Sequence, residues 1–355
     1  MTALGRVEID LGALARNYQI MVAAAAPGAC GAVVKANAYG LGVEAIAREL
    51  QQAGCEHFFV ATVDEGIELR EILPAVEIFV LDGTQGSPTE IFQASKLTPV
   101  LNSRADLRRW GSAGPAAVHV DTGMSRLGLS RSDIDALRLE RDRMPAVDVR
   151  YVMTHFACAD EPVHELNEAQ ADRFRDVCSL WPNAKTSAGN SAGMLLGDKF
   201  KSDLARPGIA LYGANPFYRA PSPVEPVVQL KARILQLRDI GPGESVGYGA
   251  TFVANEPVRV ATLGIGYADG YLRSLSNCGI AEVAGQRAPV VGRISMDLTS
   301  VDVSAVPREA VAEGDWVTLI GGSVSLEEVA ALAGTINYEL LTALGSRLER
   351  VYKSE

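Results

Sequence analysis

The chain has 355 residues, of which 48% are hydrophobic and 21% are charged, and its net charge at pH 7 is -10. This length predicts roughly two domains of about 150 residues each, and the composition is typical of a globular protein with a substantial core. The acidic balance argues against nucleic acid and anionic membranes as the main partners.

The cysteines and histidines indicate neither a disulfide framework nor a metal centre. The five cysteines are odd in number and form no C-x-x-C pair, which is typical of reduced thiols in the cytoplasm. No two of the four histidines have the spacing of metal ligands on one helix face, so we expect no metal site. No apolar run reaches the length of about 18 residues that favours a membrane span.

From residue 30 to about residue 210, short apolar runs alternate with amphipathic segments. Because strands that alternate with helices form parallel sheets, the pattern predicts an α/β fold, either a barrel or a doubly wound sheet. The count of eight strands favours a (β/α)8 TIM barrel. The expected strands are 31–35, 57–62, 77–81, 97–101, 116–121, 148–156, 183–188 and 203–209, and the expected helices are 42–54, 63–73, 103–111, 132–144 and 167–180.

The pattern changes at 218–228, a segment with three prolines that predicts a linker. Beyond it we expect a mostly β domain, so the predicted domains are 1–222 and 223–355. Its expected strands are 228–240, 258–268, 279–285, 288–294, 298–304 and 315–322, followed by short helices at 325–334 and 335–345.

The stretch "GAVVKANAYGLG" (31–42) places Lys35 at the end of a strand that is buried on both faces. One interpretation is a lysine whose ammonium group reaches the water at the rim of the sheet. The other is a Schiff-base lysine, which needs a fixed stem and partial desolvation to lower its pKa. This stretch alone does not decide between them.

Other strand ends carry charged residues. In an eight-stranded barrel the active site lies at the carboxyl ends of the strands. The expected fifth strand leads to Asp121 and Arg126, the sixth to His155 and the eighth to Arg206. A lysine, two arginines and a histidine are therefore expected around one barrel mouth.

The loops after strands seven and eight are suited to hold a phosphate. In "GNSAG" (189–193), Asn190 or Ser191 can cap a helix, and in "RPGI" the amides of Gly208 and Ile209 can face the same anion. Each loop taken alone is equally compatible with a simple helix cap. Together with a Schiff-base lysine and a cationic partner, they describe a pyridoxal phosphate site.

Arg206 has two interpretations. As the partner of the cofactor ring nitrogen it could only donate a hydrogen bond, because an arginine stays protonated. The ring nitrogen would then remain unprotonated, which favours brief carbanion formation and reprotonation. The alternative is a salt bridge with Asp203, the only acidic residue close to it in the sequence.

At this point the residues resemble the alanine racemase family along nearly the whole chain. The resemblance begins with "AVVKANAYGLG", the cofactor-lysine motif. It continues in family order with "VDTGMSRLG", "THFACAD", "GNSAG", "RPGIALYG", "VGYGATF", "GIGYADGYLR", "VVGRISMDLTSVDV" and "INYELLTALGSRLERVY".

The resemblance implies a homodimer of barrel-plus-β chains with shared active sites, bound pyridoxal 5'-phosphate and interconversion of L-alanine and D-alanine, with D-alanine supplied to peptidoglycan. Lys35 is implied as cofactor lysine and base on one face of the substrate, and Tyr248 of the partner chain as base on the other. Racemisation needs one base to remove the α-proton and another to deliver a proton from behind. His155 is implied beside Tyr248, and Arg206 beside His155.

The resemblance implies further roles for single residues. Arg126 is expected to face the cofactor and the substrate carboxylate, and the Met296 amide is expected to meet that carboxylate. Arg273 and Asp297 have alternative interpretations as a surface cation and a turn residue. The other implied positions are Tyr39, Asn190, Ser191, Gly208 and Ile209 at the cofactor, and Tyr267, Arg273 and Asp297 along the path of the substrate.

Three positions depart from the family pattern. One of them, Ser295, stands where a cysteine is frequent before the Met-Asp pair. His119 stands where many members carry a lysine that is carbamylated and supports the arginine at 126, so something else must position Arg126 here. Ser346 stands where many members have a phosphate-binding tyrosine, and its shorter hydroxyl reaches less far.

Three other functions compete with alanine racemisation. A racemase of this family with broader or serine-type specificity is one, because a small pocket separates alanine from serine by only about 1–3 kcal/mol. A non-catalytic pyridoxal phosphate carrier is another, although such carriers are single barrels. A decarboxylase of the same architecture is disfavoured, because its cysteine-based signature is missing from the C-terminal half.

Overall fold

The computed structural model describes residues 3–140, 146–217 and 221–354. The end of the expected helix 132–144 and the start of the linker 218–228 lie outside these residues. The chain divides into two compact units. The barrel unit comprises Leu14–Ala38 and Val43–Glu225, and the β unit comprises the residues up to Ala13, Tyr39–Gly42 and Pro226–Glu355.

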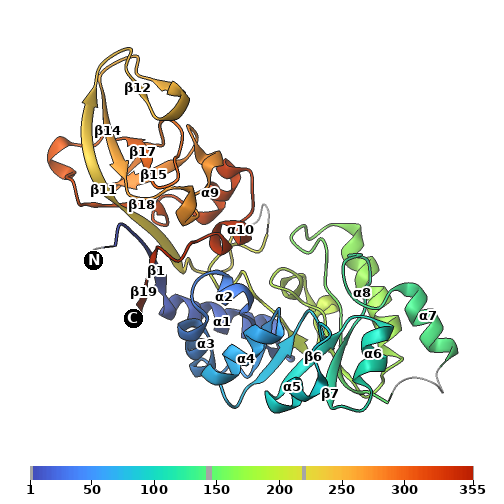
Figure 1. Cartoon of the computed structure of the whole chain (residues 1–355). Coiled ribbons are helices and arrows are strands. Elements are labelled where there is room, and N and C mark those ends of the chain that lie inside the picture. Colours follow the sequence, from blue (N-terminus) through green and yellow to red (C-terminus); the bar gives the residue numbers. More distant parts are fainter. Residues whose placement is uncertain (1–2, 141–145, 218–220, 355) are drawn as a thin grey trace. The chain divides into compact units, whose positions relative to one another are not determined.

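Parallel strands in sequential order form the barrel unit (Figure 1). The sheet runs from β3 to β9 in chain order. Its strands are β3 (Ala32–Val33), β4 (His57–Val60), β5 (Glu77–Val80), β6 (Leu97–Leu101), β7 (Pro115–His119), β8 (Asp148–Met153) and β9 (Lys185–Ser187).

A final strand closes the barrel. β10 (Leu204–Ala205) pairs in parallel with β2 (Ala29–Cys30), directly before β3. On the other side the amide of Arg206 donates to the carbonyl of Gly189, which follows β9 (2.8 Å). The predicted (β/α)8 barrel is therefore confirmed, with strands shorter than expected. The eighth, for example, ends before Pro207, which has no N–H to donate.

The helices of this unit follow the strands, and their sequence patterns explain their burial. α3 buries Val43, Ile46, Ala47 and Leu50, the spacing of one helix face. The helices are α1 (Leu11–Ala25, which begins in the β unit), α3 (Val43–Gln52), α4 (Val63–Ile72), α5 (Thr89–Ala94), α6 (Arg104–Trp110), α7 (Arg131–Leu139) and α8 (Glu165–Cys178), with 3-10 turns η2 (Gly193–Leu195) and η3 (Asp198–Phe200). The segment labelled α2 (Lys35–Tyr39) ends in the β unit, and its residues 36–38 are left-handed.

The β unit is built on a mostly antiparallel sheet in the order β16-β15-β18-β11-β1-β19, with β14 paired to β11 and β17 paired to β14. β11 (Val228–Ile240) pairs with β1, β18 and β14, and Figure 1 shows it as a long curved strand. The other strands of this sheet are β14 (Val258–Leu263), β15 (Ile280–Val283), β16 (Gln286–Pro289), β17 (Thr299–Asp302) and β18 (Trp316–Ile320). β12 (Ser245–Val246) and β13 (Phe252–Val253) pair with each other in a separate two-stranded sheet.

Two strands of this sheet were not predicted. β1 (Gly5–Asp10) pairs antiparallel with β11 and parallel with β19 (Glu349–Lys353). The predicted domain 1–222 thus differs from the structure at its start, because the first strand belongs to the β unit. The predicted helices 325–334 and 335–345 appear as α9 (Leu326–Ala333) and α10 (Asn337–Thr342).

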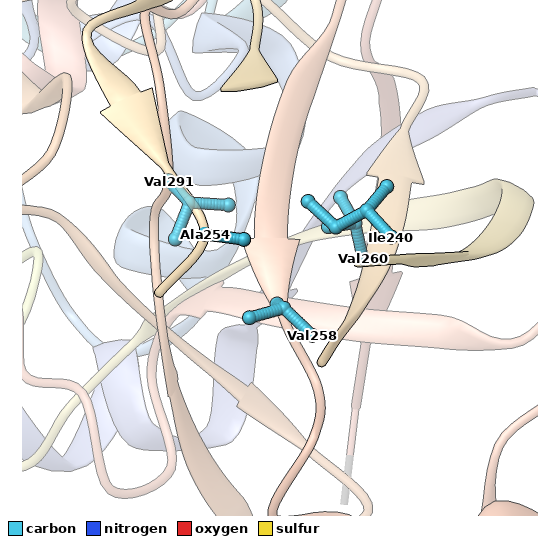
Figure 2. Close-up of a cluster of buried hydrophobic side chains, with 5 residues drawn as sticks. All are labelled: Ile240, Ala254, Val258, Val260 and Val291. Atoms are coloured by element: carbon cyan, nitrogen blue, oxygen red, sulfur yellow. The ribbon is translucent and has the colours of Figure 1, made fainter. Parts of the chain in front are cut away.

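The β unit has its own apolar core. Figure 2 shows one cluster, in which β11 and β14 contribute Ile240, Val258 and Val260, while Ala254 and Val291 come from the loops beside them. All five side chains are buried, and Val246 and Phe252 of the β12–β13 pair pack against them. Among the helices in the described ranges, none is both long and apolar enough to cross a membrane.

Candidate active site

Lys35 follows the barrel strand β3 and is half-buried. Its ammonium group makes no hydrogen bond or ion pair to any residue in the described part of the chain. Burial lowers the pKa of Lys35 below its ordinary value, and the charge of Arg126 lowers it further. Asp82 and Glu65 act in the opposite direction. An unpaired lysine with a lowered pKa is suited to act as a nucleophile or a base.

A left-handed turn follows the lysine. Ala36, Asn37 and Ala38 have φ values of 52, 53 and 52° and ψ values of 49, 50 and 53°. This conformation costs L-residues roughly 1–2 kcal/mol each, so other contacts must hold it. Glu65 accepts a hydrogen bond from the amide of Ala36 (2.7 Å), and the side chain of Asn37 accepts one from the amide of Val43 (2.7 Å).

The loop after β7 carries Arg126 on a compact turn. The Oδ1 atom of Asp121 accepts hydrogen bonds from the amides of Gly123, Met124 and Ser125 at 2.9, 2.9 and 3.0 Å. Burial alone would raise the pKa of Asp121, but these amides lower it below its ordinary value. Asp121 therefore stays ionised and fixes the turn that leads to Arg126, an exposed residue.

His155 lies between two donors. The guanidinium of Arg206 and the amide nitrogen of Asn190 each lie 3.5 Å from one ring nitrogen, Nδ1 and Nε2 respectively. Burial lowers the pKa of His155 well below its ordinary value, and the charges of Arg206 and Arg126 lower it further. The ring is therefore neutral. A neutral imidazole has one acceptor nitrogen, so only one of these two donors can form a hydrogen bond with the ring.

Arg206 is a buried cation without an ion pair to any carboxylate in the described ranges. Its guanidinium donates to Ser187 Oγ (2.7 Å) and to the carbonyl of Thr154 (2.6 Å). Asp203 instead accepts hydrogen bonds from the amide and hydroxyl of Thr186, at 2.7 and 2.8 Å. The alternative interpretation of Arg206 as a salt-bridge partner of Asp203 is therefore wrong.

His119 is neutral for the same reason as His155. Its Nδ1 atom lies 2.8 Å from Oδ1 of Asn102, whose amide nitrogen donates to the carbonyls of Leu81 and Val100. The amide oxygen thus faces the ring, so Nδ1 carries the proton. Burial lowers the pKa of His119 to about 4, helped by the charges of Arg206 and Arg126.

The two loops proposed for phosphate binding meet at Ser191. Its Oγ accepts hydrogen bonds from the amides of Gly208 (2.9 Å) and Ala210 (3.3 Å), which leaves its hydroxyl proton free to donate. Asn190 accepts from the amide of Gly193 at the start of η2 (2.8 Å). The amide of Ile209, a buried residue, has no acceptor among the described residues. These loops therefore present unsatisfied donors, as an anion site requires.

The remaining predicted residues lie in the β unit. Tyr248 begins the turn η4 (Tyr248–Ala250) between the paired strands β12 and β13, and it is 73% exposed. Tyr267 and Met296 are also exposed, and no acceptor for the Met296 amide lies in the described part of the chain. Tyr39 is buried, with its ring 6.0 Å from that of Tyr338.

Asp297 is more than a turn residue. Arg347 donates to Asp297 (2.8 Å) and to the buried carboxylate of Asp269 (2.7 Å). It thereby ties the loop around Asp297 to the neighbouring turn η5 (Tyr267–Asp269). Arg273 begins the turn η6 (Arg273–Leu275) and is exposed, as is Ser346.

Three residues that shape these sites were not predicted from the sequence: Glu65, Gln170 and Arg347. Thr62 and Glu65 match the capping-box pattern, and they do form one at the start of α4. That pattern could have located Glu65 at a helix start, but not beside Lys35. The sequence holds no comparable signal for Gln170 or Arg347, because their partners lie far away along the chain.

Comparison with known proteins identifies the family. Residues 9–216 match the family model described as alanine racemase, N-terminal domain, and residues 227–352 match alanine racemase, C-terminal domain. An alanine racemase of Acidiphilium cryptum is 48% identical over 352 residues, which cover 98% of each chain. A catabolic alanine racemase of Agrobacterium fabrum is 44% identical over 358 residues, covering 99% of this chain and 92% of that one.

Comparison with solved structures indicates the same family. The crystal structure of alanine racemase from Bartonella henselae, with covalently bound pyridoxal phosphate, superimposes with a TM-score of 0.94. The two sequences are 40% identical, and the match covers 99% of this chain and 100% of that one. The chain therefore belongs to the alanine racemase family, a family of isomerases.

Proposed function

We propose that this chain is a pyridoxal-phosphate-dependent racemase that interconverts L-alanine and D-alanine. The observation that carries the proposal is Lys35, a half-buried and unpaired lysine with a lowered pKa at the carboxyl end of a barrel strand. The family match over both domains and the cofactor-bound relative support it.

The residues of the barrel unit fit this cofactor. Arg206 is a buried cation without a carboxylate partner in the described ranges, and the Ile209 amide and Ser191 hydroxyl are donors that suit a phosphate. Lys35 would hold the cofactor, together with Tyr39, Arg126, His155 and Asn190. When bound, pyridoxal phosphate withdraws electrons from the α-carbon of the amino acid, which makes its α-proton removable.

Lys35 and Tyr248 would move this proton. The lowered pKa of Lys35 increases its neutral fraction, which can accept a proton on one face of the substrate. Tyr248 of a partner subunit would act on the opposite face. The neutral His155 ring, whose Nδ1 faces Arg206, would lie beside that phenol oxygen.

Other residues would bind and admit the substrate. The guanidinium of Arg126, an exposed residue, and the unpaired amide of Met296 suit the alanine carboxylate. We place Tyr267, Arg273 and Asp297 along the path of the substrate. Arg126 would not need a carbamylated lysine, because the Asp121 turn already positions its backbone.

We also propose a homodimer with shared active sites. Tyr248 stands 73% exposed at the end of the β12–β13 pair, and Val253, Met296 and Leu298 of the same unit are exposed apolar residues. Such residues are typical of an interface. The enzyme would act in the cytoplasm, where its five free cysteines remain reduced, and supply D-alanine for peptidoglycan.

Deuterium exchange tests the activity directly. In deuterated buffer the purified protein with pyridoxal phosphate should exchange the α-proton of L-alanine and yield D-alanine, and borohydride should fix the cofactor to Lys35. A colourless protein that rejects the cofactor would contradict the proposal, and cofactor binding without exchange would indicate a carrier. A panel of amino acids including serine separates alanine racemisation from broader specificity. Growth of a D-alanine auxotroph supplied with this chain tests the cell-wall role.

A further inference from the structure

Gln170 is a fully buried amide on α8, outside every predicted site, yet it contacts two segments that carry site residues. Its Nε2 atom donates to the carbonyl of His155 (2.9 Å) and to Thr122 Oγ1 (3.1 Å). Its Oε1 atom accepts from the amide of Ala157 (2.9 Å). The side chain is 0% exposed, so water cannot replace these bonds.

The orientation of this amide is fixed. The His155 carbonyl can only accept and the Ala157 amide can only donate, so a rotated Gln170 would oppose like groups at both contacts. The amide therefore holds the backbone on both sides of Phe156. Asn190 adds a contact to the carbonyl of Phe156 (3.4 Å). The conformation of the segment that follows β8 is thus set from α8 as well as from the barrel.

We call the hydrogen bonds of Gln170 to His155, Ala157 and Thr122 the clamp. Two buried hydroxyls, those of Thr122 and Thr154, extend it. Thr154 Oγ1 donates to the carbonyl of Val120 (2.9 Å) and lies 2.7 Å from Thr122 Oγ1. Because the Thr154 proton is already used, Thr122 donates to Thr154 and accepts from Gln170. Both threonines are buried. Each group therefore donates to the next, from Gln170 through Thr122 and Thr154 to the carbonyl of Val120, which directly follows β7.

Thr122 belongs to the turn that leads to Arg126. Arg173, one turn along α8 from Gln170, donates to the carbonyl of Thr122 (2.8 Å). The Asp121 carboxylate fixes the amides of residues 123–125 that follow. Gln170 thus acts on the loop of Arg126 and on the segment of His155 at the same time.

We propose that Gln170 is a positioning residue that sets the His155 ring and the Arg126 loop relative to each other for racemisation. The inference rests on the proposed function for the roles of His155 and Arg126, but the clamp itself is a property of the chain without cofactor. It can therefore be tested separately in both forms.

The test compares Gln170→Leu with Asn167→Leu. Asn167 lies one turn earlier on α8, is equally buried, and donates to the carbonyls of Cys158 and Glu161 rather than to that of His155. Both variants lose buried hydrogen bonds from the same helix. Only the first should alter the histidine.

In the cofactor-free protein, Gln170→Leu should speed hydrogen exchange at the Ala157 amide by about tenfold or more and shift the imidazole nitrogen resonances of His155. In the loaded enzyme it should lower kcat about tenfold or more, with KM for alanine changed less than about threefold. Asn167→Leu should leave the resonances and kcat near wild type.

Equal effects of the two variants on kcat, or unchanged Ala157 exchange, would overturn the proposal. If Gln170→Leu does not fold, Gln170→Glu replaces it, since its carboxylate can accept from Ala157 but cannot donate to His155 or Thr122 while ionised. It should keep the Ala157 protection and still shift the His155 resonances; unshifted resonances contradict the clamp. A wild-type protein that binds cofactor without racemising defeats the proposed function, whereas the cofactor-free measurements still decide the clamp.

Discussion

The carboxylate of Glu65 accepts a hydrogen bond of 2.7 Å from the amide of Ala36, the residue that follows Lys35. Its second oxygen accepts one of the same length from the amide of Ala61, at the end of β4. Glu65 also completes the capping box at the start of α4. One side chain therefore ties a helix start and a neighbouring strand to the strained turn beside the lysine.

We predict that Glu65→Gln weakens this connection. One end of the amide must face a backbone N–H with its own N–H₂ group, so the free energy of unfolding should fall by about 1–3 kcal/mol. Because the charge of Glu65 raises the pKa of Lys35, its removal should lower that pKa further. Urea denaturation measures the first effect, and the pH dependence of Lys35 acylation, followed by mass spectrometry, measures the second.

Asp64→Asn is the matched control, because it removes the same charge from the preceding, exposed position. It should leave the stability nearly unchanged. If both variants lose the same stability, the hydrogen bond to Ala36 is not what matters.

A second prediction concerns the left-handed turn and the effect of substitutions at Ala36 on the stability of the protein. This residue has φ of 52° and is exposed, so a larger side chain meets backbone strain rather than crowding. Ala36→Val should lower the free energy of unfolding by about 1 kcal/mol or more, because β-branched residues tolerate this region poorly. Ala36→Gly should raise it by up to about 1 kcal/mol. Denaturation of both variants checks the order, and a valine variant as stable as the glycine variant would contradict it.

The sequence predicted the barrel well because each of its strands is a local apolar run between turn signals. The strands β1 and β19 could not be found in this way. Gly5 pairs with Ala232 and Arg6 pairs with Glu349, so their place in a sheet depends on partners more than 200 residues away. A short alternating segment does not say which sheet it joins.

In the candidate site, too, the residues that the sequence predicted are those with a local pattern, and the residues that it missed depend on distant partners. Lys35 and Arg206 stand at strand ends, where the barrel pattern already points to chemistry. Gln170 has the appearance of an ordinary helix residue, and its contact with Thr122 spans 48 positions. The left-handed turn is equally hidden, because Ala36 and Ala38 favour a right-handed helix and only tertiary contacts overrule them.

A third prediction concerns the stability of the protein in acid. Burial lowers the pKa of His119 to about 4, while the unfolded residue keeps a pKa near 6.5. Between these two values the unfolded chain binds a proton that the folded chain does not. The free energy of unfolding should therefore fall as the pH falls through this window, by about 3 kcal/mol in total from this residue, and the contribution should be constant above it.

His119→Gln isolates this effect, because its amide can still donate to Asn102 but does not titrate. His155 also has a lowered pKa and adds to the wild-type slope. The free energy of unfolding of the wild type minus that of the variant, measured by denaturation from pH 4 to 8, should decrease as the pH falls. Parallel curves would show that His119 is as easily protonated in the folded state as in the unfolded one.

Tyr248→Phe is the fourth prediction. Without its hydroxyl the chain loses one of the two proposed bases, so removal of the α-proton from L-alanine should slow by about 10²–10⁴-fold. Cofactor binding, followed by absorbance, should change little, since Tyr248 lies on an exposed turn of the other unit. Exchange of the L-alanine α-proton in deuterated buffer gives the rate. A variant that exchanges at the wild-type rate would exclude Tyr248 as the second base.

The last prediction tests whether the active sites are shared between subunits, and it uses two inactive variants. Lys35→Ala removes the base of the barrel unit, and Tyr248→Phe removes the base of the β unit. If each site combines Lys35 of one subunit with Tyr248 of its partner, a mixed dimer of the two variants contains one intact site and one doubly altered site. An equal mixture that exchanges subunits freely should then regain about a quarter of the wild-type activity, because half of its dimers are mixed and half of their sites are intact. The recovery should appear on mixing and reach a plateau as the subunits exchange.

A chain that carries both substitutions, mixed with wild type, provides the control, since its mixed dimers contain no intact site. If the two single variants stay inactive together while a mixed dimer is demonstrated by mass, both bases must come from the same chain.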